Sequence, residues 1–228
     1  MLISIFLPVR KGSKRVKNKN FASINNFKYG LLEIKVKQFL KLRKYFKKRE
    51  IEAEFIVSTD CNITKCFIKN YSWIKIHNRT KKFSKDDCLD LFINAVHNIC
   101  LGNFILWTHV TSPLFNHFDY IHFLEFFLKS RKNFQSAFSA TLIGSYVLNK
   151  KYKWISHNMK KKKWPRTQDL SPLYIVNNAA FIANRNVYKI CKNRLDSFPL
   201  PILSRKGSDL DIDNKHDFDY FKKISRIL

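Results

Sequence analysis

The sequence is poor in features that mark several classes of protein. Glycine and proline are scarce, with 5 and 6 residues among 228, and neither a GxxxxGKS/T phosphate loop nor a GxGxxG dinucleotide fingerprint occurs. No apolar run reaches about 18 residues, so we expect no membrane span and no membrane partner. The first apolar run precedes the first charges and lacks a small-residue cleavage site, which favours a buried strand over a signal peptide. We therefore expect a cytoplasmic protein.

Cysteine is also infrequent. Five cysteines, an odd number without any CxxC pair, occur at scattered positions. This pattern argues against a zinc site and favours reduced, mostly buried thiols.

Acidic residues are few. The chain has 17 Asp and Glu residues and 43 Lys and Arg residues, which gives a formal net charge of +26. Such an excess can mark a nucleic-acid-binding protein. However, Lys, Asn, Ile and Phe are all abundant, a composition that an AT-rich genome produces irrespective of function. Lysines spread over the whole chain, with one dense block at residues 160–163. We expect a solvated surface that attracts a polyanionic small substrate, and no nucleic-acid partner.

Apolar runs typical of strands alternate with amphipathic runs typical of helices. This alternation predicts an α/β fold, a single domain over residues 1–228 whose mostly parallel sheet has helices on both faces. Residues 145–164 break the pattern and predict a small excursion from the sheet. Strands are expected at residues 2–7, 54–57, 73–76, 104–110, 135–142, 175–182 and 210–212, and helices at 31–46, 64–69, 87–100, 118–129 and 217–227.

The segment LPVRKGSKRVKNKN, residues 7–20, is the most informative one. It places the cations Arg10, Lys14 and Lys19 on a loop directly after the first expected strand. The small residues Gly12 and Ser13 let backbone N–H groups approach phosphate oxygens. The loop therefore predicts a polyphosphate site, with an ordinary surface turn as the alternative.

Two carboxylates near the end of the chain suit a metal ion. Asp211 and Asp213 are two residues apart, so in an extended segment they lie on one face. Carboxylate pairs suit Mg²⁺, which takes its remaining ligands from substrate phosphates and water. Helix capping is the alternative role for them. A polyphosphate-binding loop together with a pair of metal-binding carboxylates is typical of a nucleotidyltransferase.

Five segments, in order and spanning nearly the whole chain, resemble motifs of the acylneuraminate (CMP-sialic acid) cytidylyltransferase family. They are residues 7–20, Val57-Ser58-Thr59-Asp60, Thr111-Ser112-Pro113-Leu114, residues 166–177 and Asp211-Ile212-Asp213 with Asp217.

The resemblance implies a Rossmann-like nucleotidyltransferase fold (GT-A-like) with a small dimerisation excursion, and a homodimer. It implies Mg²⁺ as the cofactor, with CTP and an acidic nine-carbon sugar as the substrates. The anomeric hydroxyl of the sugar would attack the α-phosphorus, releasing pyrophosphate and giving the CMP-sugar.

The resemblance also assigns roles to individual residues. Arg10, Lys14 and Lys19 are expected to be catalytic, because they would neutralise charge that shifts toward the leaving group. The expected nucleotide contacts are Arg10, Gly12, Ser13, Asn20, Arg79 and Asp90; the sugar contacts are His109, Ser112, Arg166, Gln168, Tyr174 and Asn177; the metal ligands are Asp211 and Asp213.

Two departures from the family pattern bear on the substrates. His109 replaces a glutamine associated with the sugar, and neutral histidine offers a donor and an acceptor at its two nitrogens. Asp90 lies near an expected base contact, where a carboxylate accepts from the exocyclic amine of cytosine or of guanine. Activation of a Kdo-like acid, use of another nucleotide, and a basic nucleic-acid-binding role on a degenerate transferase fold therefore stay open as alternatives.

Overall fold

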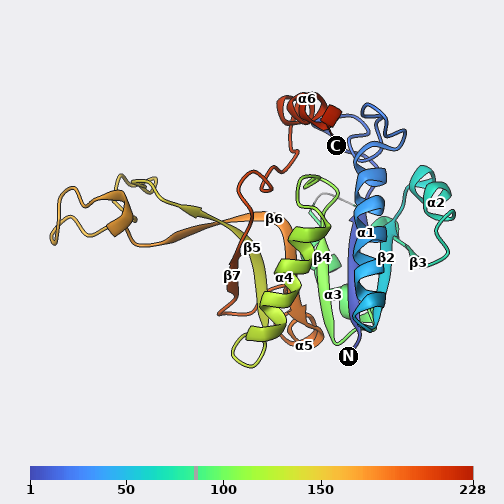
Figure 1. The fold of residues 1–228 in the computed structure, drawn as a ribbon, viewed down its shortest axis with the longest axis horizontal. Coiled ribbons are helices and arrows are strands. Elements are labelled where there is room, and N and C mark those ends of the chain that lie inside the picture. The colour runs from blue at the N-terminus through green and yellow to red at the C-terminus, as the bar shows by residue number, and fades with distance from the viewer. Residues whose placement is uncertain (85–86, 228) are drawn as a thin grey trace.

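The computed structural model describes residues 1–84 and 87–227, and within them seven strands form one sheet in the order β3-β2-β1-β4-β6-β5-β7 (Figure 1). None of the helices in these ranges is long and apolar enough to cross a membrane. The strands are β1 (Ile3–Val9), β2 (Ala53–Thr59), β3 (Ile74–Asn78), β4 (Phe104–Thr108), β5 (Ser136–Ile143), β6 (Leu173–Asn184) and β7 (Leu200–Leu203). The helices are α1 (Gly30–Lys48), α2 (Asn62–Ile68), α3 (Leu89–Ile99), α4 (His117–Ser130), α5 (Arg185–Ile190) and α6 (Lys215–Ile224).

The sheet is mostly parallel, as predicted. Strands β3, β2, β1 and β4 pair in parallel, β6 runs antiparallel to β4 and β5, and β7 is parallel to β5. Alternate side chains of β1 enter two separate cores, Ile5 on one face and Phe6 on the other. Helices α1 and α4 cover the first face, and α3 and α5 cover the second. The predicted α/β class, a mostly parallel sheet with helices on both faces, is confirmed.

The prediction of a strand at residues 210–212 is wrong. The segment is irregular, and the backbone N–H of Ile212 donates to the carbonyl of Thr111 at 2.7 Å. Ile212 is buried, so its apolar character reflects packing and not a place in the sheet. Strand β7 and helix α5 were not expected, because both are short and β7 contains a proline, which is tolerated at a sheet edge.

Residues 144–172, here called the arm, connect β5 to β6 and project far from the sheet (Figure 1). The arm includes the excursion expected at about residues 145–164. It has a small aromatic cluster, in which the rings of Tyr146 and Trp164 lie 5.2 Å apart and those of Trp154 and Trp164 5.7 Å apart. Tyr152 at its tip is 86% exposed. The arm is thus a folded projection with its own aromatic contacts.

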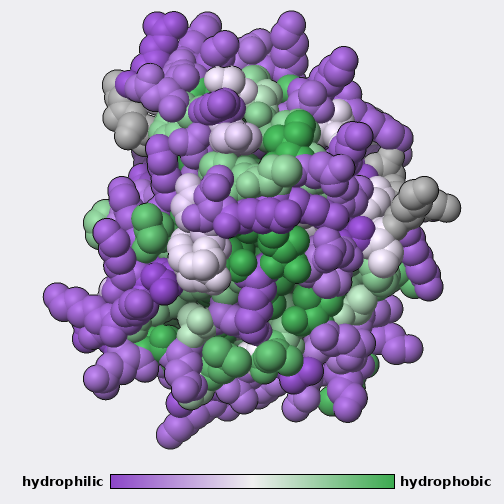
Figure 2. Space-filling view, turned by 90° about the vertical axis from the view of Figure 1, so that its right-hand side faces the viewer, coloured by the Kyte–Doolittle hydropathy of each residue, from purple (hydrophilic) through white to green (hydrophobic). Residues whose placement is uncertain are grey.

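The surface is strongly hydrophilic. In Figure 2, charged and polar side chains cover most of the face beside β3, with apolar side chains showing between them. This agrees with the dispersed lysines of the sequence, because solvated lysines need no common partner.

Candidate active site

A cavity of about 560 Å³ lies where the carboxyl ends of β1, β3 and β4 meet. In open α/β sheets this edge is where ligands bind. The cavity is lined by Pro8, Arg10, Ser13, Lys14, Arg15, Lys19, Asn20, Arg79, Leu89, Phe92, Trp107, His109, Val110 and Thr111.

The loop after β1 is held in shape by contacts with its own backbone and with the next strand. Lys11 donates its backbone N–H to Asp60 Oδ1 at 2.8 Å, and Asn20 Nδ2 donates to the carbonyl of Arg10 at 3.2 Å. Gly12 has a φ of +88°, a conformation that side chains disfavour. These constraints turn Ser13 and Lys14 toward the cavity, whereas Gly12 is exposed and does not line it.

The loop cations meet the carboxylate segment at the mouth of the cavity. Lys19 Nζ donates to the carbonyl of Ile212 at 2.6 Å and lies 3.9 Å from Asp213 Oδ1. Arg15 forms an ion pair with Asp213. Burial lowers the pKa of Lys19, and the charges of Asp213 and Asp211 oppose that effect. The two ends of the chain therefore build one charged centre.

Asp211 is the more enclosed of the two carboxylates. Burial raises its pKa, while hydrogen bonds from Thr111 and Asn178 and the charge of Lys19 act in the opposite direction. Neither Asp211 nor Asp213 caps α6, because Asn214 is the cap and accepts from the N–H of Asp217 at 3.0 Å. Neither carboxylate therefore serves as the helix cap; Asp213 pairs with cations of the loop after β1, and Asp211 accepts hydrogen bonds from Thr111 and Asn178.

Arg79 contributes to the cavity from another part of the chain, directly after β3. Its Nε donates to the carbonyl of Phe83 at 2.7 Å, and its guanidinium lies 3.9 Å from the ring centroid of Phe92. Burial lowers its pKa. These contacts hold a cation and an aromatic face at the cavity wall, which suits a nucleobase or ribose. Asp90, in the first turn of α3, is exposed and does not line the cavity.

Among the expected sugar contacts, His109 lines the cavity, and the others lie elsewhere. Ser112 is fully buried, and its Oγ has no hydrogen-bond partner among the described residues. Asn177 is buried within β6, an internal strand, and donates to Ser204 Oγ at 2.7 Å.

The remaining three sugar candidates are associated with the arm. Arg166 and Gln168 lie on it, and Tyr174 lies at the start of β6, where the arm returns. Arg166 is exposed and makes two hydrogen bonds to Asp169, at 2.9 and 3.1 Å. None of the three lines the cavity of its own chain.

Sequence reasoning missed Lys35, whose side chain is fully buried beneath the segment that follows β4. Its Nζ donates to the carbonyls of Ser112 and Phe115, at 3.0 and 3.3 Å, and to Tyr120 Oη at 2.9 Å. The available signal was a lysine at an apolar position of α1, between Ile34 and Val36. Arg194, from the loop after α5, was also missed and had no sequence signal.

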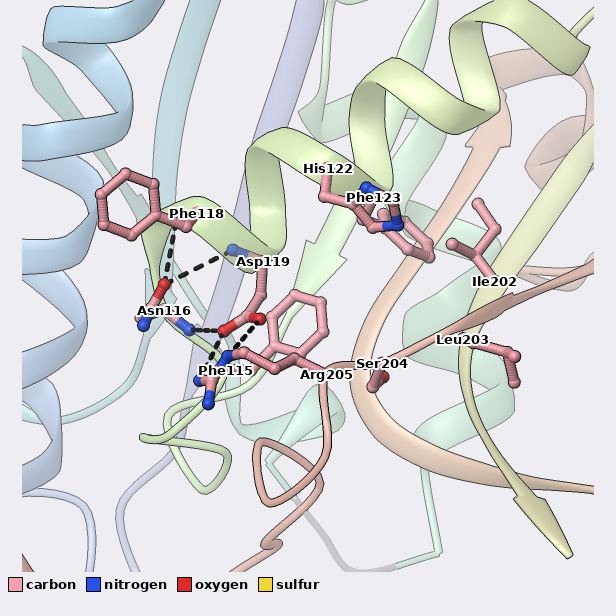
Figure 3. A pocket seen from close by; sticks show the side chains of 10 residues that line it. All are labelled: Phe115, Asn116, Phe118, Asp119, His122, Phe123, Ile202, Leu203, Ser204 and Arg205. Atoms are coloured by element: carbon pink, nitrogen blue, oxygen red, sulfur yellow. Dashed lines mark hydrogen bonds and ion pairs between the residues drawn. The ribbon is translucent and has the colours of Figure 1, made fainter.

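A second cavity, of about 400 Å³, lies between the start of α4 and β7 (Figure 3). Its charged side chains pair with each other, because Asp119 accepts from Arg205 Nε at 3.1 Å and from Nη2 at 3.2 Å. Phe115, Phe123 and Ile202 make much of its wall apolar. This cavity lacks a loop of converging cations, so the phosphate chemistry belongs to the first cavity.

Comparison with known proteins agrees with this geometry. A protein-family profile described as cytidylyltransferase matches residues 4–224. No curated protein matches the sequence. The fold is similar to that of CMP:2-keto-3-deoxy-manno-octonic acid synthetase complexed with CTP, with a TM-score of 0.67 and 12% identity over 100% of both chains.

Two further solved structures have the same fold. A 4-diphosphocytidyl-2C-methyl-D-erythritol synthase from Anaerococcus prevotii has a TM-score of 0.65 and 12% identity, over 99% of this chain and 98% of that one. A 2-C-methyl-D-erythritol 4-phosphate cytidylyltransferase from Thermus thermophilus has a TM-score of 0.53 and 10% identity, over 97% and 98%. At these identities the likeness concerns the fold.

Proposed function

The chain belongs to the cytidylyltransferase family, nucleotidyltransferases that use CTP, and we propose that it transfers the cytidylyl group to an acidic, sialic-acid-like nonulosonic sugar. The observation that carries the proposal is the junction at Lys19, a residue that lines the cavity and connects the cationic loop after β1 to the carboxylate segment. A triphosphate needs both parts, cations for its oxygens and carboxylates for its metal ion.

The reaction develops negative charge, which the cations of the cavity would stabilise. The anomeric hydroxyl oxygen of the sugar forms a bond to the α-phosphorus, and the bond between that phosphorus and the pyrophosphate oxygen breaks. The proton of the hydroxyl group is released to water. Negative charge accumulates on the leaving pyrophosphate. Arg10, Lys14 and Lys19 would stabilise this charge, because fixed cations in a partly enclosed cavity need no reorganisation during the step.

Mg²⁺ fits the carboxylate segment. The described residues contain no group of three or more His, Cys, Asp or Glu side chains that could hold a metal ion by itself. Asp211 and Asp213 would therefore supply two carboxylates, and phosphate oxygens and water the rest, which is the usual arrangement for Mg²⁺. When bound there, the ion would neutralise phosphate charge and orient the triphosphate.

An acidic acceptor is supported by the excess of cations around the cavity. Arg10, Lys14, Arg15, Lys19 and Arg79 all line it, whereas no carboxylate of the described residues does. A Kdo-like acid is the second candidate, because a synthetase for 2-keto-3-deoxy-manno-octonic acid shares the fold.

We further propose a homodimer in which the arm of one chain reaches the cavity of the other. Arg166 and Gln168 resemble sugar contacts but lie on the projecting arm, away from their own cavity. Exposed aromatic side chains on the arm, Tyr152 at 86% and Trp164 at 65%, suit burial against a second copy.

The proposal is tested by pyrophosphate release from CTP with a panel of nonulosonic acids and Kdo, with and without Mg²⁺. Release should require one acidic sugar and Mg²⁺, and it should disappear in Asp211→Ala. GTP, UTP and ATP serve as controls for the base. Absence of release with every sugar and every nucleotide would refute the proposal.

A further inference from the structure

We propose that Trp107 and Arg194 lock His109 as a neutral imidazole that presents a single Nδ1–H donor to the cavity, where it recognises an acceptor oxygen of the sugar. The identity of that ligand rests on the proposed function. The state of the imidazole does not, because it follows from the protein's own contacts.

One nitrogen of His109 is already used inside the protein. Trp107 Nε1 lies 3.0 Å from His109 Nε2, and Arg194 Nη1 lies 3.4 Å from the same nitrogen. Indole and guanidinium N–H groups donate and never accept. Nε2 must therefore keep its lone pair, and the single proton of a neutral imidazole belongs on Nδ1.

Arg194 is a half-buried cation with aromatic neighbours. Its guanidinium lies 3.8 Å from the ring centroid of Phe181 and 5.6 Å from that of Trp107, two residues that face each other across β4 and β6. Among the described residues, no carboxylate lies within ion-pair distance of it. Cation–π contacts therefore hold the guanidinium beside His109.

The same surroundings oppose a second proton on His109. Burial lowers its pKa to about 3, and the charges of Arg194 and Lys35 contribute in the same direction. Protonation would also direct an N–H from Nε2 against two donors. The imidazole is neutral throughout the range in which an ordinary histidine titrates.

The other ring nitrogen of His109, Nδ1, is available to the substrate. His109 lines the cavity, is partly exposed, and makes no hydrogen bond through Nδ1 to any described residue. The cavity therefore receives a donor and no acceptor from this side chain. A glutamine would offer both, so the histidine restricts its partner to a carboxylate, carbonyl or hydroxyl oxygen. It also excludes His109 as the base that takes the proton of the anomeric hydroxyl.

The locked state is measured on the free protein by ¹⁵N NMR of histidine-labelled chains. The chain has 7 histidines, and comparison with His109→Gln assigns the signals of His109. We expect a protonated Nδ1 and an unprotonated Nε2, unchanged between pH 5 and pH 8. A proton on Nε2, a mixture of tautomers, or titration in that range would overturn the proposal, whether or not any sugar is a substrate.

The role of Arg194 is measured by kinetics. Because Arg194 is the second donor to Nε2, Arg194→Met should loosen the imidazole and raise the KM for the sugar about tenfold, with the KM for CTP changed less than about twofold. Arg43→Met is the matched control, since Arg43 lies 5.3 Å from the ring of Trp73, outside the cavity. Equal effects of the two variants on the KM for the sugar would contradict a positioning role.

The acceptor requirement is measured with His109 itself. His109→Leu removes the donor and should raise the sugar KM by about tenfold to a hundredfold, the usual effect of losing a hydrogen bond to a charged group. His109→Gln restores a donor and should recover most of the loss. If the two variants are equally impaired while both are folded by circular dichroism, recognition through Nδ1–H is refuted.

Discussion

Lys19 Nζ donates a hydrogen bond of 2.6 Å to the carbonyl oxygen of Ile212, and this contact joins the two main segments of the candidate active site. Asn25 strengthens the junction, because its side chain donates to the carbonyl of Lys222 at 2.9 Å, at the end of α6. The loop after β1 and the segment before α6 are thus fixed relative to each other before any substrate binds. Such preorganisation is what electrostatic stabilisation of a transition state requires.

Replacing Lys19 should therefore affect both the charge and the junction. We expect Lys19→Met to lower kcat by about a hundredfold to a thousandfold, the usual effect of removing one preorganised group that stabilises developing charge. Lys17→Met is the control, since Lys17 is exposed on the same loop and does not line the cavity. A Lys19→Met enzyme within tenfold of the wild type in pyrophosphate release would exclude the role.

Asp211 should control the response to Mg²⁺. Asp211→Asn retains the shape of the side chain but removes its charge, so the Mg²⁺ concentration for half-maximal activity should rise and kcat should fall by about a hundredfold or more. Asp219→Asn, an exposed carboxylate on α6, serves as the control. If both variants show the wild-type Mg²⁺ dependence, the metal is bound elsewhere.

Much of the fold could be predicted from the sequence, because local patterns determine it. The alternation of apolar strands and amphipathic helices predicted β1 to β6 and five of the six helices within a few residues of their ends. The strand expected at residues 210–212 failed because a short buried apolar segment has the same pattern whether it joins a sheet or packs against a turn. Helix α5 has six residues, too few for a periodic signal.

The lining of the candidate site was predictable where one segment supplies several of its side chains. Arg10, Ser13, Lys14, Lys19 and Asn20 all come from the loop after β1, and all line the cavity.

Residues that act through contacts made only in the folded chain were not predictable. Lys35 contacts residues 77 and 85 positions away along the chain, and Arg194 contacts His109 across 85 positions. No spacing rule in the sequence reports such pairs. The tautomer of His109 depends on these contacts, so the sequence left both of its nitrogens available.

The buried Lys35 should make stability depend on pH. Burial lowers its pKa from 10.5 to about 7, against the opposing charge of Asp119. Above pH 7 the folded chain loses this proton while the unfolded chain keeps it until about pH 10. The unfolded state then binds more protons, so the free energy of unfolding should rise between pH 7 and pH 10 by up to about 1.4 kcal/mol per pH unit.

Urea unfolding at pH 7, 8 and 9 measures this slope. Lys35→Met should lose the contribution, and the difference between wild type and variant should change with pH. Lys37→Met is the matched control on the same helix, because Lys37 is 54% exposed and pairs with Glu33 at the surface. Parallel curves for wild type and Lys35→Met would show that Lys35 titrates normally in the folded protein.

The composite site proposed for the dimer can be tested by complementation. In a symmetric dimer whose arms exchange, each cavity would combine Lys19 of one chain with Arg166 of the other. Lys19→Met and Arg166→Met should each inactivate the homodimer, since the first disables the cavity and the second disables the arm. A mixed dimer would contain one cavity with intact Lys19 that receives an intact Arg166. If subunits exchange at random, half of the dimers are mixed and one of their two sites works, so activity should return to about one quarter of the wild-type value.

The control replaces Arg166→Met by Lys14→Met in the mixture. Lys14 and Lys19 line the same cavity. In a mixed dimer of Lys14→Met and Lys19→Met chains, one cavity therefore lacks Lys14 and the other lacks Lys19. No complete site forms, and no activity should return. Sedimentation of the wild type checks the oligomeric state directly. Two results would contradict the composite site: a monomeric protein, or a mixture of Lys19→Met and Arg166→Met chains that exchange subunits yet stay inactive. Arg166 would then act in its own chain or in no site. In the second case its contact with Asp169 would be its whole role.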